Sequence, residues 1–218
     1  MMPTLDYHDK IAVLDLGGDE NRFSPAFLDE VNAHLDTALA EGAQGLVTTA
    51  SGKFYSNGLD LDWLGANSDR GPWYVERVQA LFARVLTLPV PTAAALPGHA
   101  FGAGAMLAIA HDYRVMRADR GYFCFPEVDI RIPFTPGMAA LIQAKLPPKT
   151  AVASMTTGRR YGGQAAAEVD IVDAAVAEGQ VLASALEMLI PLGGKDSGTL
   201  GAIKNTMFAP AVAALTTP

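Results

Sequence analysis

An alternation of strand-like and helix-like segments is the feature that most constrains the fold of this 218-residue chain. Lys10–Leu16, KIAVLDL, is a short apolar run that predicts a strand, and Gly45–Thr49, GLVTT, predicts a second. Between them, Ser24 followed by Pro25 indicates a helix start, and apolar residues then recur at helical spacing as far as Gly42. A strand–helix–strand order predicts parallel strands joined by a right-handed crossover, and therefore an α/β fold.

The alternation continues along the chain, and helices dominate its last third. Further strands are expected at Thr92–Leu96, Tyr113–Met116 and, late in the chain, Val169–Val172. The expected helices are Trp73–Leu86, a short one opened by Leu59–Leu61, one after Gly137, Pro147–Thr157, a short one after Gly163, Ala174–Leu189 and Leu200–Leu215. No low-complexity linker separates these segments, so we expect one globular unit.

The stretch Ala94–Asp112, AALPGHAFGAGAMLAIAHD, passes from an apolar strand through a glycine-rich turn into an apolar helix. Glycines allow a close approach to the main chain, and free N–H groups at a helix start favour a negative charge. The turn can therefore hold a phosphate or an oxyanion formed during a reaction; a packed turn without chemistry is the alternative. The glycine order from Gly98 is G-x-x-x-G-x-G, which matches neither a dinucleotide site nor a P-loop.

Two other segments carry groups that suit a functional site. Residues 51–63, SGKFYSNGLDLDW, follow a predicted strand, and ligands tend to bind beyond strand ends in α/β sheets. Glu127 lies in the apolar segment YFCFPEV, and apolar surroundings raise the pKa of a carboxyl so that it can act as a base or an acid. The loop Ile132–Pro136 suits a pocket wall. An ordinary surface turn and a water-facing glutamate are the alternatives.

Composition disfavours several classes of partner and site. The formal net charge is −7 and no Lys/Arg cluster is present, so we expect no nucleic-acid partner. No apolar run approaches the roughly 18 residues of a membrane span, and the first residues lack the layout of a signal peptide. The single cysteine, Cys124, cannot form an internal disulfide, so we predict a cytoplasmic protein with no membrane partner. The histidines lack metal-ligand spacing, and we expect no metal site.

Three motifs follow one another in the central part of the chain: KFYSNGLDLDWL, PGHAFGAGAMLAIAHDYRV and FCFPEVDIRIPFTPG. In this order and at these separations they resemble the crotonase, or enoyl-CoA hydratase/isomerase, superfamily. The resemblance implies a crotonase-like spiral of repeated ββα units in residues 1–140 and an α-helical C-terminal trimerisation region in residues 141–218. It also implies an acyl-CoA thioester substrate, a homotrimer or dimer of trimers, and no cofactor other than the coenzyme A of the substrate.

The resemblance further implies roles for particular residues. Family members hold the thioester oxygen between two backbone N–H groups, which here fall at Leu59 and Ala103. The second donor opens a helix, so the helix dipole would help to stabilise an enolate oxygen. The matched substrate-binding residues are Asn57, Gly58, Asp60, Leu61, Gly102, Gly104, Phe125, Ile132 and Phe134.

Acid–base residues separate the activities of this superfamily. Hydratases carry one glutamate two residues beyond the last glycine of the turn and a second in the later Pro-Glu motif. Here the first position is Met106 and the second is Glu127. A single base can move a proton along a substrate, so the resemblance implies a Δ3,Δ2-enoyl-CoA isomerase of fatty acid β-oxidation, with Glu127 as catalytic base and acid.

Other activities stay open from the sequence. Asp129 would share a face with Glu127 on a strand, and it is either a second acid or a surface charge. As an acid it would permit a residual hydratase, an acyl-CoA hydrolase or a dehalogenase. A non-catalytic acyl-CoA binder that kept the fold is the alternative from another class.

Overall fold

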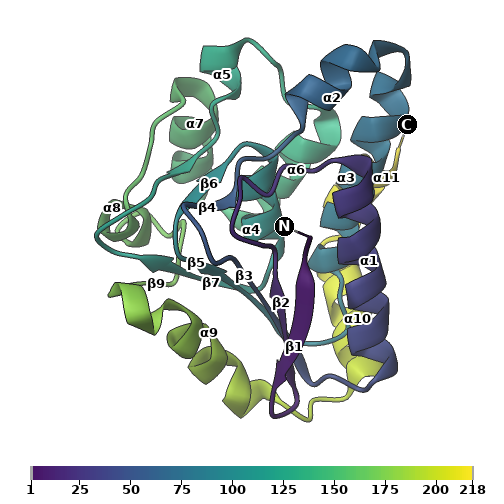
Figure 1. The fold of residues 1–218 in the computed structure, drawn as a ribbon, viewed down its shortest axis with the longest axis vertical. Helices are drawn as coiled ribbons and strands as arrows, with labels where there is room; N and C mark the ends of the chain where they lie inside the picture. Colours follow the sequence, from purple (N-terminus) through teal and green to yellow (C-terminus); the bar gives the residue numbers. More distant parts are fainter. Residues whose placement is uncertain (1, 218) are drawn as a thin grey trace.

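Six strands form the main sheet of the computed structural model, which describes residues 2–217 (Figure 1). Their order is β1-β2-β3-β5-β7-β9; β1 is antiparallel to β2, and every other neighbouring pair is parallel. Val13 pairs with Val47 and Val47 with Ala93, which sets the register across the centre of the sheet. The strands are β1 Thr4–His8, β2 Ile11–Asp15, β3 Gly45–Thr49, β5 Thr92–Leu96, β7 Tyr113–Arg117 and β9 Ala174–Val176.

A second, smaller sheet contains β4 (Phe54–Ser56), β6 (His99–Phe101) and β8 (Phe123–Cys124), in that order and all parallel. Each short strand follows a strand of the main sheet, because β4 comes after β3, β6 after β5 and β8 after β7. A helix begins soon after each short strand, so the chain repeats a ββα unit. The predicted α/β fold of repeated ββα units is therefore confirmed.

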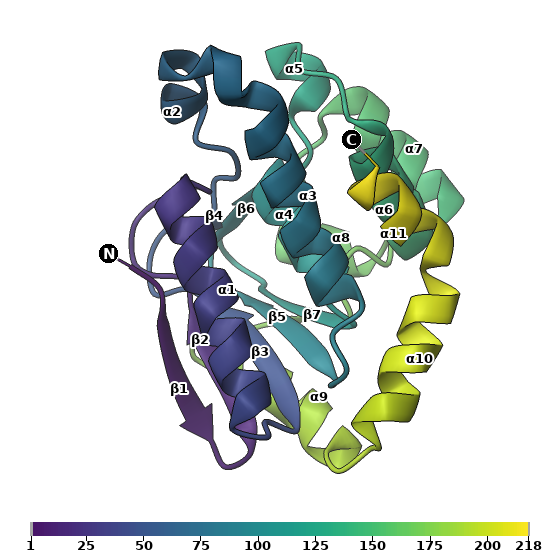
Figure 2. The same ribbon diagram turned by 90° about the vertical axis from the view of Figure 1, so that its right-hand side faces the viewer.

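Helices account for most of the remaining chain. They are α1 Pro25–Ala40, α2 Leu61–Ala66, α3 Gly71–Leu86, α4 Ala103–Ala110, α5 Glu127–Ile130, α6 Pro136–Lys145, α7 Pro148–Thr157, α8 Gly163–Ala167, α9 Val181–Leu189, α10 Ser197–Met207 and α11 Ala209–Thr216, with 3-10 turns η1 Ser68–Arg70, η2 Glu178–Gln180 and η3 Ile190–Leu192. α1 packs against α3, and α11 packs against α6 and α3 (Figure 2). Within residues 2–217 no helix combines the length and apolar character needed to cross a bilayer.

The main sheet has two apolar faces because successive side chains of a strand point to opposite sides. Ile11 belongs to a smaller core that α9 covers, whereas Ala12 and Leu14 belong to the larger core that also includes α1 and α3. Every residue of α4 is buried, most of them within this larger core. The glycine turn that opens α4 is therefore attached to the most deeply packed helix of the described chain.

Two expectations near the C-terminus were wrong in position. The late strand lies at Ala174–Val176 rather than at 169–172, and the helix expected from Ala174 begins only at Val181. Pairing of β9 with β7 overrides the helical periodicity there. The helix expected over 200–215 is divided between α10 and α11, where Pro210 cannot donate a helical hydrogen bond. The boundary at residue 140 stays a prediction, and β9 adds a strand to the region that the resemblance describes as helical.

Candidate active site

The carboxyl ends of the three parallel strands of the small sheet lie at one edge, and each leads into a segment with a predicted site residue. β4 is followed by Leu59, β6 by Ala103 and β8 by Glu127. All three residues line one cavity of about 320 Å³. The remaining lining residues are Arg22, Asn57, Leu61, Asp62, Phe101, Gly102, Pro126, Ile130 and Ile132. Segments that are distant in sequence thus meet because parallel strands end at the same edge.

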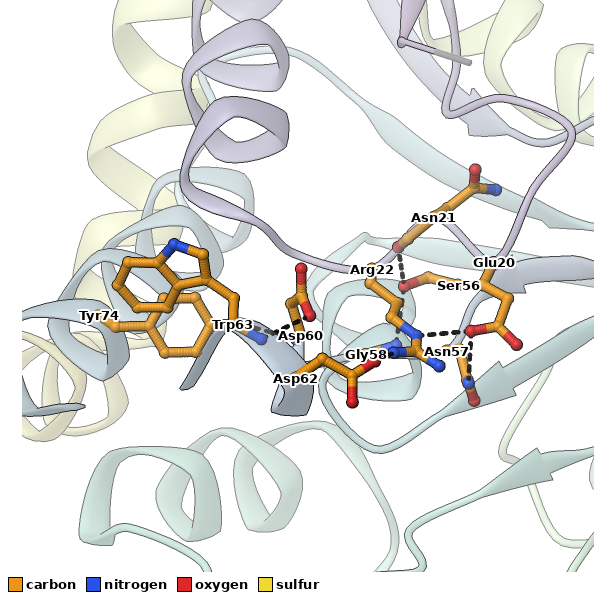
Figure 3. Close-up of polar contacts among 10 residues, drawn as sticks. All are labelled: Glu20, Asn21, Arg22, Ser56, Asn57, Gly58, Asp60, Asp62, Trp63 and Tyr74. Atoms are coloured by element: carbon orange, nitrogen blue, oxygen red, sulfur yellow. Dashed lines mark hydrogen bonds and ion pairs between the residues drawn. The ribbon is translucent and has the colours of Figure 1, made fainter. Parts of the chain in front are cut away.

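The loop that carries Leu59 is held on both sides of this residue. Gly58 has a φ of +82°, in the left-handed region that favours glycine, and its carbonyl accepts a hydrogen bond from the Phe23 amide at 2.9 Å. On the other side, the Asp60 amide donates to Tyr74 Oη at 2.9 Å. Figure 3 shows Tyr74 and the residues around this loop. The position of the Leu59 amide therefore depends on partners in other segments.

The turn that carries Ala103 is held by main-chain contacts. Gly102 has a φ of +50°, and its amide donates to the Cys124 carbonyl at 3.0 Å. A Cβ added to Gly58 would lie only 2.9 Å from the Ala103 nitrogen, so the Leu59 loop touches the start of α4. Ala103 is the first residue of α4, where amides lack intrahelical partners and the helix dipole is positive. Among residues 2–217, neither the Leu59 nor the Ala103 amide donates a hydrogen bond to another protein group.

Glu127 provides a carboxyl group to the same cavity, next to the turn that carries Ala103. The residue is 8% exposed at the start of α5, and burial raises the pKa of its carboxyl from 4.5 to about 7, although a bond to its own backbone amide opposes this shift. Its Oε2 atom has no hydrogen-bond partner among the described residues. A Cβ on Gly102 would lie 3.3 Å from Oε1, so the carboxyl lies against the turn that carries Ala103. Such a group is suited to take up and release a proton near neutral pH.

Four of the predicted substrate-binding residues line the same cavity as Leu59, Ala103 and Glu127. They are Asn57, Leu61, Gly102 and Ile132. Asn57 comes from the loop after β4 and Leu61 from the first turn of α2. Gly102 comes from the turn before α4 and Ile132 from the segment after α5. Their contact with a substrate stays a prediction, but the structure brings all four to one place.

Three further predicted residues lie behind the cavity wall and shape it. Gly58 and Gly104 allow two segments to touch, since a Cβ on Gly104 would lie 2.4 Å from the Ser56 carbonyl oxygen. Asp60 is the N-cap of α2, and its side chain accepts a hydrogen bond from the Trp63 amide at 3.0 Å. These residues determine where the Leu59 amide lies without lining the cavity themselves.

Phe125 and Phe134 belong to an apolar wall on the far side of Glu127. Phe125 is fully buried, and its ring meets that of Phe134 edge-on, with 6.2 Å between the ring centroids. Phe134 lines a neighbouring cavity of about 510 Å³ together with Glu127 and Ile132. Glu127 thus lies between two hollows, one with the free amides and one with mainly apolar walls.

Comparison with known proteins identifies the family of the chain. The family described as enoyl-CoA hydratase/isomerase matches residues 8–217 of the chain. The chain belongs to this family. Enoyl-CoA delta isomerase 2, peroxisomal, from Arabidopsis thaliana is 39% identical over 196 residues, which cover 84% of this chain and 82% of that protein. Enoyl-CoA delta isomerase 1, peroxisomal, from the same plant is 31% identical, and the match covers 95% of this chain and 90% of that protein.

More distant members of the family extend the comparison. Carnitinyl-CoA dehydratase of Escherichia coli strain K12 is 30% identical over 73% of this chain and 61% of that protein. The solved structure of human mitochondrial delta3-delta2-enoyl-CoA isomerase matches with a TM-score of 0.91 and 21% identity. The match covers 99% of this chain and 85% of the human chain. At this identity the similarity concerns the fold alone.

Met106 occupies the position at which the family resemblance places the first glutamate of a hydratase. Its side chain is fully buried in the larger core and does not line the cavity with Glu127. Glu127 is the buried carboxylate among the residues that line this cavity, and the other acidic lining residue, Asp62, is exposed and has its carboxylate bonded to Arg22.

Asp129 would share a face with Glu127 on a strand, but the structure has a helix here. The segment from Glu127 to Ile130 is a short helix, in which residues two apart point to nearly opposite sides. Asp129 is exposed, and its carboxylate lies against the turn after α7, where a Cβ on Gly158 would meet Oδ2 at 2.4 Å. The surface-charge alternative is therefore the one that the structure supports.

The sequence did not indicate Arg22 and Asp62 as parts of this site. Arg22 Nη1 donates to Asp62 Oδ2 at 2.5 Å, and both residues line the cavity (Figure 3). Arg22 lies in GGDENRF, a segment that reads as a turn before a helix. No local pattern predicts this pair, since the two residues are distant in sequence. They meet only when β4 has paired in the small sheet.

Proposed function

We propose that this chain is a Δ3,Δ2-enoyl-CoA isomerase that moves the double bond of a 3-enoyl-CoA to the 2-trans position. The observation that carries the proposal is Glu127, a buried carboxylate that lines one cavity with Leu59 and Ala103, whose amides have no protein acceptor among residues 2–217. The isomerase names of the Arabidopsis relatives support the same reaction.

The reaction begins when ionised Glu127 removes a proton from C2 of the 3-enoyl thioester. The electrons of the broken C–H bond move toward the carbonyl, and a dienolate forms with negative charge on the thioester oxygen. The amides of Leu59 and Ala103 donate hydrogen bonds to this oxygen, and each such donor typically contributes about 2.7–4 kcal/mol of transition-state stabilisation. Glu127 then returns the proton to C4, which leaves a C2–C3 double bond conjugated with the thioester.

The surroundings of Glu127 suit this proton transfer. A pKa of about 7 lets the carboxyl exist in both protonation states near neutral pH. Phe125, Ile132 and Phe134 limit access of water to the proton while it resides on Glu127. The base and the oxyanion donors all come from the chain, so the proposed reaction needs no metal or redox cofactor, and coenzyme A enters with the substrate.

The alternative reactions lack a second proton-transfer group. Hydration requires one group to activate water and another to deliver a proton, and Met106 and Asp129 supply neither in this structure. A non-catalytic binder would not need a buried carboxyl with an unpaired oxygen, which costs free energy unless it serves a purpose.

The test compares two carboxylate-to-amide changes on α5. Glu127→Gln removes the base, and we expect conversion of 3-enoyl-CoA to 2-enoyl-CoA to fall by about 10²–10⁴-fold. Asp129→Asn is the matched control, because it removes an exposed carboxylate two residues away, and its rate should stay near that of the wild type. Retained isomerisation in Glu127→Gln, with correct folding by circular dichroism, would overturn the assignment.

The proposal includes assembly and location as well. A homotrimer or dimer of trimers follows from the family, and the exposed apolar residues Ile190, Ile203 and Met207 near the C-terminus are suited to such contacts. Light scattering of the purified protein tests the assembly. A cytoplasmic location stays a prediction, and two of the plant relatives are named as peroxisomal.

A further inference from the structure

Arg22 joins the two ends of the loop that carries the Leu59 amide. Its Nε donates to Glu20 Oε2 and its Nη1 to Asp62 Oδ2, both at 2.5 Å (Figure 3). Glu20 Oε2 also accepts from Asn57 Nδ2 at 3.4 Å. Asn57 precedes Leu59 by two residues and Asp62 follows it by three. The guanidinium therefore lies between a contact at the start of the loop and a contact at its end.

Main-chain hydrogen bonds place Arg22 directly beside this loop. The Asn57 amide donates to the Glu20 carbonyl at 2.8 Å, and the Phe23 amide donates to the Gly58 carbonyl at 2.9 Å. Residues 20–23 thus run alongside residues 57–58. The Arg22 side chain leaves this paired segment and reaches the first turn of α2, where Asp62 lies.

The far end of the loop has apolar contacts, because Leu59, Trp63 and Leu64 pack against the larger core and the Trp63 ring contacts those of Trp73 and Tyr74. None of the α2 residues is buried, and Asp62 itself has a side chain that is 88% exposed. Beyond Gly58, the polar contacts of the loop to other segments of the described chain include the Asp60 amide bond to Tyr74 Oη and the bond from Arg22 to Asp62. The Arg22 contact therefore acts beside the apolar packing in setting how closely α2 and the Leu59 amide approach the start of α4.

An ordinary surface ion pair is the plain alternative interpretation. Exposed pairs contribute little to stability, and Arg22, Glu20 and Asp62 are all partly exposed. The location separates the two interpretations, because Arg22 and Asp62 line the same cavity as Leu59, Ala103 and Glu127. A pair in this place can affect the geometry of the site even when it contributes little to folding.

We propose that Arg22 is a positioning residue for the Leu59 amide. Bound between Glu20 and Asp62, its planar guanidinium holds residues 57–62 at the distance from α4 at which the Leu59 and Ala103 amides can share one oxygen. The structural part of this inference stands alone, and its catalytic consequence rests on the proposed isomerase function.

The kinetic experiment compares three variants with the wild type on a 3-enoyl-CoA. Displacement of a catalytic group by about 1 Å can lower a rate by about 10²-fold, so we expect Arg22→Ala to lower kcat by about 10–100-fold with KM within about 3-fold. Arg22→Lys should recover only part of the rate, because an ammonium group cannot bridge two carboxylates as a planar fork does. Arg77→Ala is the matched control, since Arg77 forms a comparable surface pair with Asp29 between α3 and α1, and its kcat should be unchanged.

A second measurement tests the positioning without any activity. Hydrogen–deuterium exchange of peptides that cover residues 57–66 should be faster in Arg22→Ala than in the wild type, with no change in Arg77→Ala. If exchange is faster in Arg22→Ala than in the wild type but the wild type does not isomerise the substrate, the proposed function fails and the positioning role of Arg22 stands. Unchanged exchange in Arg22→Ala, or a higher KM with an unchanged kcat, would show that Arg22 does not position the loop. Either result would overturn the inference.

Discussion

The two predicted oxyanion donors lie in regions that the chain holds in place by different means. The Ala103 amide opens α4, whose residues are all buried, most of them in the larger core. The Leu59 amide lies in a loop before α2, and α2 has no buried residue. The first donor is positioned by core packing and main-chain geometry. The second is positioned by the Phe23 amide, which donates to the Gly58 carbonyl, by Tyr74 Oη, which accepts from the Asp60 amide, and by the Arg22 ion pair.

This difference has a consequence for mutations. Changes near Ala103 should act first on folding, because they disturb a close-packed helix. Changes near Leu59 should act first on the rate, because the loop contributes little to the core but must hold an amide in place. The four predictions below test this contrast in order of decreasing expected effect.

The largest effect is expected on stability in the Ala103 region. Met106→Ala removes a fully buried side chain from the core around α4 and should lower the free energy of unfolding by about 2–5 kcal/mol. Leu61→Ala, in the half-exposed first turn of α2, should change it by about 0.5 kcal/mol or less. Urea unfolding of both variants measures the contrast, and equal losses would contradict it.

The next effect is expected where the two regions touch. Gly58→Ala adds a Cβ that would lie 2.7 Å from the Phe101 carbonyl oxygen and 2.9 Å from the Ala103 nitrogen, at a φ of +82°. We expect kcat/KM to fall by about 10²–10³-fold, the effect of losing one oxyanion donor. Gly65→Ala is the control, because nothing lies within 4 Å of its added Cβ, and it should keep the wild-type rate. Steady-state kinetics of the two variants measures this difference. Equal activity of Gly58→Ala and Gly65→Ala would contradict a role of Gly58 in placing the Leu59 amide.

A third prediction concerns the dependence on pH that Glu127 causes. This residue lines the same cavity as Leu59 and Ala103. Its pKa is about 7 in the folded chain, against 4.5 for an unperturbed glutamate. The folded state therefore binds more protons between these values, and the stability that this group contributes is complete below pH 4.5 and is lost as the pH rises through 7. The shift corresponds to roughly 3 kcal/mol, so Glu127→Gln should unfold at higher temperature than the wild type at pH 8.5 and at a similar temperature at pH 4.5.

The activity of the wild type should show the opposite dependence on pH. The base must be ionised to remove the C2 proton, so kcat/KM should rise as the pH increases through about 7. Calorimetry and a pH–rate profile together test this pair of trends. A wild type that gains stability relative to Glu127→Gln as the pH rises would contradict the burial of Glu127.

The smallest effect is expected from a single hydroxyl near Leu59. Tyr74→Phe removes the acceptor of the Asp60 amide and should lower stability by about 0.5–1.5 kcal/mol and kcat several-fold. Tyr55→Phe removes another buried hydroxyl, which bonds to Thr48 Oγ1 at 2.7 Å, and should cost similar stability with kcat unchanged. If both variants lower kcat to the same extent, the contact with Tyr74 has no particular role in the site.

Much of this architecture could be predicted from local patterns. Apolar runs separated by amphipathic segments indicated β2, β3, β5 and β7, and the glycine turn before α4 indicated a helix start that can face a negative charge. β4, β6 and β8 were not predicted as strands, because segments of two or three residues are too short to show a periodicity. The sequence left Asp129 open between a second acid and a surface charge for the same reason, since a single turn of helix has no repeat that distinguishes it from a strand.

The sequence by itself determined the chemistry that the site can contain: a glutamate among apolar residues, two glycine-dependent turns and a methionine where a second acid would stand. These features depend on residue types and short spacings. Only the tertiary structure decided that Glu127 lines one cavity with Leu59 and Ala103, that Asp129 points away, and that Arg22 bonds to Asp62. The physical reason is that these contacts form where three parallel strands end at one edge, and strand pairing across the chain leaves no local pattern in the sequence.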